Sequence, residues 1–491
     1  MSSRSIKKNT IYNAIKTCSG IVFPLITFPY VSRVLLAESL GKINFSSSIV
    51  GYFSLIASLG VSTYAVRECS KVKDDSKRLS ITASEIYTIN AYSTLIACAL
   101  LLLTLLFARR LDNYRTLILI QSSGIVFTTF GADWINNVAE DFGFITLRTL
   151  GFNILSVFLM FMLVKKPDDY ITYAVITLVA SMGANVTNIL YRRKYCRIRL
   201  VRNPQFGVHL KPIMMLFSLQ LIQTIYVSSD VTILGLVRTV TEVGWYSAAV
   251  KIYSLIQTLM NSVVLVVLPQ LSQAYANEDY IKANGLLRYS LNFIVGLGLP
   301  CLIGVNVVAP EVIMLLAGES FLACVPSLRI LTFALFWSFL GGFLGNLIMI
   351  PSGREDVSLA SSVVSAIVNL VLNLVLIPRW GIEAAAATTT VSMAIGFFYK
   401  LPFVDRRVGV GPMRSIVMGP IVGCFAIVLI GLACNRVIPN YFIRFTAIVA
   451  LSVVGYFICL LACRNELGCE IAKSIVKLAH AFSASKGGKR G

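Results

Sequence analysis

Apolar blocks of about twenty residues recur along this sequence and restrict its fold more than any other feature, because a helix of that length spans the roughly 30 Å hydrocarbon core of a bilayer. We expect membrane-spanning helices at 11–33, 42–64, 84–107, 115–136, 143–164, 170–191, 213–236, 245–269, 288–309, 326–350, 358–378, 382–401, 415–434 and 442–462. Only 13% of the 491 residues are charged, whereas soluble domains average about 25%. No segment alternates polar and apolar residues as the strand of a membrane β-barrel does. The sequence therefore predicts an all-α polytopic membrane protein of about 14 transmembrane helices.

The positive charge of the chain, a net +20, follows the pattern of a membrane protein. Lys and Arg gather between the apolar blocks, and the chain lacks a basic stripe interleaved with aromatic residues of the kind that binds single-stranded nucleic acid. With the N-terminus inside, the cytoplasmic loops hold more Lys and Arg than the loops on the other side, as the positive-inside rule requires. We expect both termini in the cytoplasm and no nucleic-acid partner.

A basic segment at 192–212 divides the chain after six predicted helices. We expect residues 1–191 to form an N-terminal lobe, residues 213–401 a C-terminal lobe of six helices in a similar arrangement, and 402–465 two further helices. The basic segment is then a cytoplasmic linker that is attracted to anionic membrane lipids. In the tail, 466–491, apolar residues first recur at helical spacing, which predicts an amphipathic surface helix followed by a disordered end.

A weak internal repeat supports two lobes of similar structure. The tripeptide Tyr-Val-Ser occurs at 30–32 and again at 226–228. An acidic residue and a glycine follow each copy, and these are Glu38 and Gly41 in the first copy and Glu242 and Gly244 in the second. Lobes with an even number of helices keep the same orientation in the membrane, so we expect parallel repeats with the transport site at their interface.

Charged side chains inside the spans require a reason, because burying a charge in the bilayer costs several kcal/mol. Most of them lie within about two turns of a predicted helix end, where a long side chain reaches the interface by snorkelling. These residues are Lys16, Glu85, Asp133, Arg148 and Arg329. Arg33 ends the first helix on the periplasmic side, where its side chain faces either water or a central cavity.

Asp230 and Lys251 lie too deep in their helices to reach an interface. They form either a salt bridge that staples two helices or part of a polar cavity that binds a phosphate or a coupling cation. Polar stripes favour the cavity, because they run for more turns than hydrogen bonding between helices needs. Gln223, Tyr226 and Asp230 share one helix face, and Asn369 and Asn373 share another.

Catalytic and metal-binding signals are weak in this sequence. The eleven Cys are scattered without a CxxC pair, and the two His are His209, expected in a loop, and His480 in the tail. We find no nucleophile with a base, no phosphate-binding glycine loop and no zinc motif. We therefore expect no metal, no cofactor and no enzymatic activity, and a protein that uses an ion gradient or moves its substrate downhill.

The stretch Ile26–Phe53 (ITFPYVSRVLLAESLGKINFSSSIVGYF) strongly resembles the first two helices of bacterial O-antigen flippases. These proteins form the polysaccharide transporter family within the multidrug/oligosaccharidyl-lipid/polysaccharide flippase superfamily. The following residues SLIASLGVSTYAVRECS, and the stretch Ile377–Gly396, are also similar to that family. One departure is Leu36-Ala37, where the family commonly has Gly-Pro, so this turn is expected to be less rigid than usual.

The resemblance implies two six-helix lobes in a V around a central cavity, in the bacterial inner membrane. It also implies transport of an undecaprenyl-diphosphate-linked oligosaccharide, the O-antigen repeat unit, from the cytoplasmic to the periplasmic leaflet by alternating access. A polysaccharide polymerase and a chain-length regulator are the partners that it suggests. Matched by position, the cations expected to bind the substrate are Arg33 first, then Lys251, Arg148 and Arg329. Asp230 and Asp133 are expected to bind a coupling ion or to pair with these cations.

Other functions remain open at this point. A multidrug/cation antiporter of the same superfamily would have a cavity dominated by acidic residues, whereas basic residues dominate here. A lipid II flippase is a further alternative, although the match at Ile26–Phe53 disfavours it. A membrane glycosyltransferase or polymerase would need larger periplasmic loops or a catalytic acidic motif.

Overall fold

The computed structural model describes residues 3–405 and 407–473, and it gives no side-chain detail for residues 3–10, 259–263 and 265. Contacts divide the chain into two compact units. Unit 1 comprises Met1–Ser247, Leu316–Phe321 and Leu370–Ile382, and unit 2 comprises Ala248–Leu315, Leu322–Asn369 and Glu383–Gly491. This division follows packing and differs from the lobes expected from the basic linker, which stay a prediction.

The described residues form helices and turns and contain no strand, which confirms the all-α prediction. The helices of unit 1 are α1 (Ser3–Ser58), α2 (Val61–Ser70), α3 (Ser76–Phe107), α4 (Arg115–Gly131), α5 (Trp134–Val138), α6 (Phe142–Leu163), α7 (Tyr170–Tyr191) and α8 (Phe206–Val237). Those of unit 2 are α10 (Tyr280–Val307), α11 (Ala309–Leu316), α12 (Val325–Gly342), the π-helical η5 (Phe343–Met349), α14 (Met413–Val437) and α15 (Tyr441–Ala462). The helices α9 (Val240–Ala276) and α13 (Glu355–Lys400) contribute to both units, and the last residue of α11, Leu316, belongs to unit 1.

Eleven helical segments in the described part of the chain are long and apolar enough to cross a membrane. Two of them, Ile11–Ser70 and Glu355–Phe403, each contain two of the predicted spans. The predicted span 245–269 falls in α9, some of whose side chains are outside the described set. The structure thus confirms a polytopic helical membrane protein, and the predicted helix count is approximate.

Two breaks between helices that the sequence predicted as loops are sharp kinks instead. The chain runs through α1 with a single non-helical residue, Leu36, at φ 61° and ψ 178°. It runs through α13 in the same way, with Gly381 at φ 60° and ψ −132°. Neither place has the cluster of turn-forming residues that an extended loop needs, so one residue with positive φ changes the helix direction.

Helix ends are marked by polar residues in the sequence. Asp75 accepts hydrogen bonds from two backbone N–H groups in the first turn of α3, and Asn440 does the same for α15. Asp141 and Asp279 each cap one N–H at the start of α6 and α10. These caps satisfy donors that have no partner within the helix, so the sequence marks where these four helices begin.

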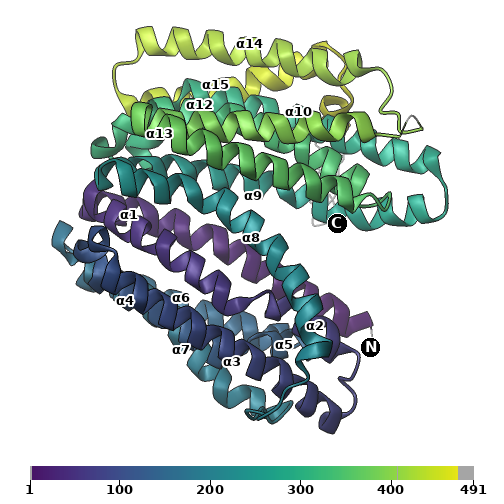
Figure 1. Ribbon diagram of the computed structural model, residues 1–491. Helices are drawn as coiled ribbons and strands as arrows, with labels where there is room; N and C mark the ends of the chain where they lie inside the picture. Colours follow the sequence, from purple (N-terminus) through teal and green to yellow (C-terminus); the bar gives the residue numbers. More distant parts are fainter. Residues whose placement is uncertain (1–2, 406, 474–491) are drawn as a thin grey trace, which may run out of the picture. The chain divides into compact units, whose positions relative to one another are not determined.

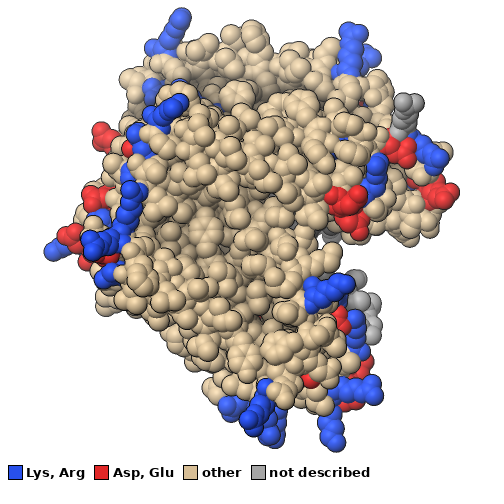
Figure 2. All heavy atoms as spheres, in the orientation of Figure 1, with Lys and Arg blue, Asp and Glu red and all other residues tan. Residues whose placement is uncertain are grey.

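Within each unit the long helices run side by side (Figure 1). In unit 1, α1 packs against α3, α4, α6 and α8, and α4 packs against α7. In unit 2, α10 packs against α12 and α14, and α14 packs against α15. Large apolar side chains stay exposed at mid-helix, among them Leu95 at 68% and Phe425 at 66%. Figure 2 shows uncharged residues over the middle of the helices and charged side chains toward their ends, the pattern expected when lipid covers the middle.

The two copies of the sequence repeat touch each other inside unit 1. A Cβ atom on Gly41 would lie 1.7 Å from the carbonyl oxygen of Val240, and one on Gly244 would lie 1.9 Å from that of Ala37. Each glycine thus packs on the backbone four residues before the other glycine. Such reciprocity is the signature of a local two-fold relation between the two motifs, and it explains why both copies need glycine at this position.

Candidate functional site

Asp230, the deepest acidic residue that the sequence singled out, lies in a buried hydrogen-bond network of unit 1. The Tyr246 hydroxyl donates to Asp230 Oδ2 at 2.6 Å, and the Asn373 side-chain amide donates to Asp230 Oδ1 at 2.5 Å. Asn373 is fully buried, and Asp230 is 5% exposed. The network links α8, α9 and α13, so a proton or cation arriving at this carboxylate would act on three helices at once.

The other residues expected around Asp230 have different environments. Gln223 is exposed and Tyr226 is half-buried on α8. Asn369 is fully buried on α13, one turn from Asn373, but it belongs to unit 2. Lys251 also belongs to unit 2, where it is half-buried on α9. Its pairing with Asp230, either as a staple or within a cavity, therefore stays a prediction.

Arg148 and Asp133 meet in a second polar cluster of unit 1. Helix α4 ends at Gly131, and the next residue, Ala132, has a φ of 48° that turns the chain so that Asp133 faces α6. Arg148 Nη2 then donates to Asp133 Oδ2 at 2.7 Å. The Arg148 side chain is only 4% exposed, whereas that of Asp133 is 46% exposed. The sequence predicted snorkelling for both residues. The family resemblance added substrate binding for Arg148 and, for Asp133, a coupling ion or pairing with one of the cations, without saying which one.

This second cluster retains unused hydrogen-bonding capacity. The Nε and Nη1 groups of Arg148 and the Oδ1 atom of Asp133 are buried and have no hydrogen-bond partner among the described residues. Beside them, Asn136 donates to Asn188, and Asn188 donates to the carbonyl oxygen of Gly131 at 2.8 Å. Unpaired buried N–H groups cost free energy unless another group satisfies them. The cluster can therefore accept a small polar ligand, an ion or a transient substrate group.

The remaining cations expected to bind substrate are accessible. Arg33 is exposed on α1, three residues before the kink at Leu36, and its Nη1 donates to the carbonyl oxygen of Pro29 at 2.8 Å. Arg329 is exposed on α12, and its Nε donates to the carbonyl oxygen of Asn306 at 3.3 Å. A guanidinium group carries five N–H donors, and the contact of Arg329 with Asn306 uses one of them.

A buried chain of polar side chains escaped the sequence analysis. His209 is not in a loop: it lies in the first turn of α8 and is 5% exposed. Tyr64 Oη and His209 Nδ1 lie 2.8 Å apart, and His209 Nε2 lies 3.1 Å from Glu85 Oε2. Glu85 is therefore held by His209 rather than by snorkelling. The sequence held one signal for this contact, namely that the chain has only two histidines. A histidine that becomes buried needs a polar partner, so each of the two was worth testing for one.

Unit 2 contains an apolar groove on the side of α10, α14 and α15. Its volume is about 760 Å³, and its walls include Leu297, Val305, Phe445 and Phe457. Almost all of the groups that line it are hydrocarbon, so water inside it would find almost no hydrogen-bond partners. An acyl or prenyl chain is the ligand that such a surface suits.

Sequence comparison places this architecture in a family. A family model described as "Polysaccharide biosynthesis protein" matches residues 6–275, more than half of the chain. A putative O-antigen transporter of Shigella dysenteriae is 21% identical over 395 residues, which cover 79% of this chain and 98% of that protein. A putative O-antigen transporter of Escherichia coli (strain K12) is 23% identical over 297 residues, covering 58% of this chain and 69% of that protein.

Solved structures show the same fold. The lipid II flippase MurJ in an inward closed conformation superimposes with a TM-score of 0.74 at 18% identity, covering 92% of this chain and 97% of that chain. An outward-facing multidrug resistance transporter of the MATE family superimposes with a TM-score of 0.51 at 16% identity, covering 81% of this chain and 95% of that chain. The family expected from Ile26–Phe53 is thereby confirmed. This chain is a multi-pass membrane protein that belongs to the polysaccharide biosynthesis protein family, whose fold is that of the flippases and multidrug transporters.

Proposed function

We propose that this protein is a flippase that moves an undecaprenyl-diphosphate-linked oligosaccharide, the O-antigen repeat unit, from the cytoplasmic to the periplasmic leaflet of the inner membrane. The observation that carries the proposal is the match to a putative O-antigen transporter over 98% of that protein's length. Transport proceeds by alternating access, with both termini of the chain in the cytoplasm. The protein is a transporter and not an enzyme.

The chemistry of the substrate supports this proposal. A lipid-linked oligosaccharide has a long apolar chain, an anionic diphosphate and a hydrophilic sugar headgroup. The groove along α10, α14 and α15 offers hydrocarbon walls for the chain. Arg33 and Arg329 offer guanidinium donors for the diphosphate. Lys251 and the two unpaired N–H groups of Arg148 add further cationic donors.

Coupling to an ion gradient is part of the same proposal. Asp230 accepts hydrogen bonds from Tyr246 and Asn373, and Asp133 pairs with Arg148, so each carboxylate is tied to groups on neighbouring helices. Binding of a proton or sodium ion at either carboxylate would weaken these hydrogen bonds or this ion pair and so lower the free energy needed to rearrange the helices. Asp230 is the preferred site because it is the more deeply buried of the two.

The alternative functions have less support. The fold shared with the lipid II flippase and with a multidrug transporter does not distinguish their substrates, since both likenesses lie below 20% identity. The curated relatives point to surface glycans: beside the two O-antigen transporters they include a probable glycan biosynthesis flippase of Haloferax volcanii, 23% identical over 198 residues. A polysaccharide polymerase and a chain-length regulator are the partners that we propose for the step after flipping.

Deletion of the gene in its host tests the proposal. Lipid-linked repeat units should accumulate in the cytoplasmic leaflet, where they stay protected from a membrane-impermeant galactose or hexosamine oxidase added to spheroplasts. Surface O-antigen should disappear, and re-expression of the protein should restore it. Normal surface polysaccharide combined with lost drug tolerance would show the antiporter to be correct instead.

Arg33 provides the sharpest residue test of the substrate site. We expect Arg33→Ala to abolish complementation of the deletion and Arg33→Lys to retain part of it, because a diphosphate needs positive charge more than guanidinium geometry. Arg436→Ala is the matched control, since Arg436 is likewise an exposed arginine on the side predicted to be periplasmic. Full activity of Arg33→Ala, at an expression level equal to that of the control, would remove Arg33 from the site.

A further inference from the structure

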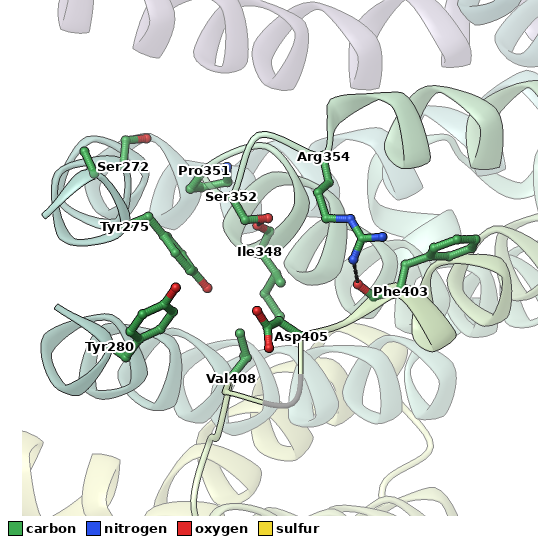
Figure 3. A pocket seen from close by; sticks show the side chains of 11 residues that line it. Ser272, Tyr275, Tyr280, Ile348, Pro351, Ser352, Arg354, Phe403, Asp405 and Val408 are labelled. Atoms are coloured by element: carbon green, nitrogen blue, oxygen red, sulfur yellow. Dashed lines mark hydrogen bonds between the residues drawn. The ribbon is translucent and has the colours of Figure 1, made fainter. Parts of the chain in front are cut away.

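A second, polar pocket lies entirely within unit 2 and has no part in the site described above. It is formed where the end of α9 and the start of α10 meet the turn after η5 and the segment that follows α13 (Figure 3). Its volume is about 290 Å³, near the lower limit of roughly 300 Å³ for small-molecule sites. The side chains that give it chemical character are Ser272, Tyr275, Tyr280, Ser352, Arg354 and Asp405.

The pocket presents hydroxyl groups and a carboxylate toward its interior. Figure 3 shows the hydroxyls of Tyr275 and Tyr280 and the carboxylate of Asp405 directed toward the same space. The Tyr275 hydroxyl is buried and has no hydrogen-bond partner among the described residues. A buried hydroxyl without a partner costs free energy, and a ligand that satisfies it recovers that cost. The pocket is therefore built for a ligand that both donates and accepts hydrogen bonds.

The charges at the pocket are already engaged with protein groups. Arg354 Nη1 donates to the carbonyl oxygen of Phe403 at 2.5 Å, and its guanidinium lies 5.6 Å from the centre of the Phe403 ring. Arg407 donates to the Tyr280 hydroxyl at 3.3 Å, and its backbone N–H donates to Asp405 Oδ1 at 2.9 Å. A free phosphate would be repelled by Asp405, and a metal cation would find a single carboxylate in a pocket that Arg354 also lines. The balance of charge selects against both.

A neutral sugar ring fits this set of groups. Its hydroxyls alternate between donor and acceptor roles, which match the phenols, serines and carboxylate of the pocket. Its C–H face is apolar and packs on aromatic rings, and Tyr275 and Tyr280 supply two rings set edge to face, with centroids 6.2 Å apart. The loops that form the pocket are those expected on the cytoplasmic side, where a lipid-linked oligosaccharide waits before it is flipped.

We propose that this pocket binds an uncharged sugar residue of the lipid-linked substrate at the cytoplasmic surface. This inference rests on the proposed flippase function and adds a headgroup site in unit 2, separate from the cations expected to bind the diphosphate. The pocket recruits substrate by its sugar before the diphosphate reaches the cations expected to bind it. It also makes transport sensitive to which sugar the headgroup carries.

Saturation-transfer NMR on the full chain in detergent tests the pocket directly. The probes are the methyl glycosides of glucose, galactose and N-acetylglucosamine at millimolar concentration, with inorganic pyrophosphate as the anionic probe. We expect at least one glycoside to bind, and Tyr275→Phe and Asp405→Asn each to weaken that binding at least fivefold. Tyr289→Phe and Glu278→Gln are the matched controls, because both residues are exposed and lie outside the pocket lining. All four variants should match the wild type in size-exclusion profile and thermal midpoint.

Several results would overturn the pocket proposal. These are the absence of binding by all three glycosides, glycoside binding that both pocket variants leave unchanged, and pyrophosphate binding that Arg354→Gln abolishes. The flippase proposal fails separately, through normal surface polysaccharide in the deletion strain. Glycoside binding that depends on Tyr275 and Asp405 would uphold the sugar site even then, because it is measured without transport.

Discussion

Single residues inside the membrane spans show how this protein handles buried charge. Asp230 is satisfied by neutral donors, Glu85 by a histidine, and Arg148 by a carboxylate. In each of the three cases, hydrogen bonds from neighbouring side chains stabilise the ionisable group in a low-dielectric region where contact with water is reduced. Arg148 is the least satisfied of the three, since two of its donor groups lack a partner among the described residues.

The first prediction concerns the Arg148–Asp133 pair. Asp133→Asn removes the carboxylate and leaves a buried guanidinium without a counter-charge. Breaking a fully buried pair costs about 3–5 kcal/mol, and we expect about 1–3 kcal/mol here because water reaches Asp133. Thermal unfolding in detergent should therefore begin at a distinctly lower temperature than for Asp74→Asn, a change at an exposed loop residue. Equal midpoints for the two variants would show that the pair contributes nothing to stability.

At the scale of elements, α1 carries an unusual backbone conformation at its kink. Leu36 has φ 61° and ψ 178°, a region that essentially only glycine adopts without strain. The resemblance at Ile26–Phe53 points to the same place, where this chain has Leu36-Ala37 instead of the expected Gly-Pro. The kink is present although leucine disfavours this backbone conformation, and the lower rigidity expected for this turn stays a prediction.

Relieving this strain is the second prediction. Leu36→Gly should raise the thermal midpoint, with a gain of about 1 kcal/mol, because the strain of 1–3 kcal/mol outweighs the extra entropy of glycine. The Leu36 side chain is 41% exposed, so little burial is lost. Leu25→Gly, at a similarly exposed position of regular helix in α1, should instead destabilise by about 1 kcal/mol. A loss of stability in both variants would contradict the strained kink.

The linker after α7 is a second element with a defined docking mode. The backbone N–H groups of Arg197, Arg199 and Val201 donate to the side-chain oxygens of Ser80, Ser84 and Thr88 on α3, at 3.3, 3.1 and 3.0 Å. Two residues of the extended linker advance about 6.6 Å, and the four residues that separate successive hydroxyls on α3 advance about 6 Å. Because these distances match, every second backbone N–H of the linker lies opposite the next hydroxyl of α3. The basic linker is thereby held along α3, with the side chains of Arg197 and Arg199 exposed.

The third prediction concerns the hydrogen bonds between the linker and α3. The labelling rate of the Cys196 thiol measures whether these bonds hold. Burial raises the pKa of the Cys196 thiol to about 11 although Arg192 opposes the shift, so the thiol is protonated and unreactive at neutral pH. Ser84→Ala removes one of the three acceptors, and we expect N-ethylmaleimide to label Cys196 severalfold faster, as measured by peptide mass spectrometry. Ser122→Ala, which removes a half-buried hydroxyl from α4, is the control. An unchanged labelling rate would mean that the hydroxyls do not hold the linker.

For the molecule as a whole, transport requires helix contacts that form and break. The reciprocal packing of Gly41 and Gly244 joins the second half of α1 to the start of α9 through backbone atoms. Backbone contacts of this kind leave no side chain to adjust, so the contact is either made or open. That property suits a gate with two states rather than a graded one.

The fourth prediction tests that contact. Gly41→Ala and Gly244→Ala each place a methyl group within 2 Å of a carbonyl oxygen, so the contact must open. We expect each variant to lower surface O-antigen at least tenfold at normal protein level, because one state of the transport cycle is lost. Gly51→Ala on the same α1 helix, where a Cβ meets open space, should retain full activity. Normal transport by the Gly41 and Gly244 variants would show that the contact is not part of the cycle.

The sequence by itself determined the membrane character, the helical fold and the family, because each depends on local information. Hydropathy over twenty residues, a capping Asp and the motif at Ile26–Phe53 are all readable within one segment. Helix continuity at Leu36 was less predictable, since a one-residue kink carries no turn signature.

Only the tertiary structure decided which polar groups meet. Asp230 and Asn373 are 143 residues apart in the chain, and His209 and Glu85 are 124 apart. Periodicity places each of these residues on a face of its own helix, but it does not say which helix lies opposite. That choice is set by packing of whole helices against one another, to which every residue of the interface contributes. The partners of the buried charges therefore follow from the fold, while their presence inside the membrane follows from the sequence.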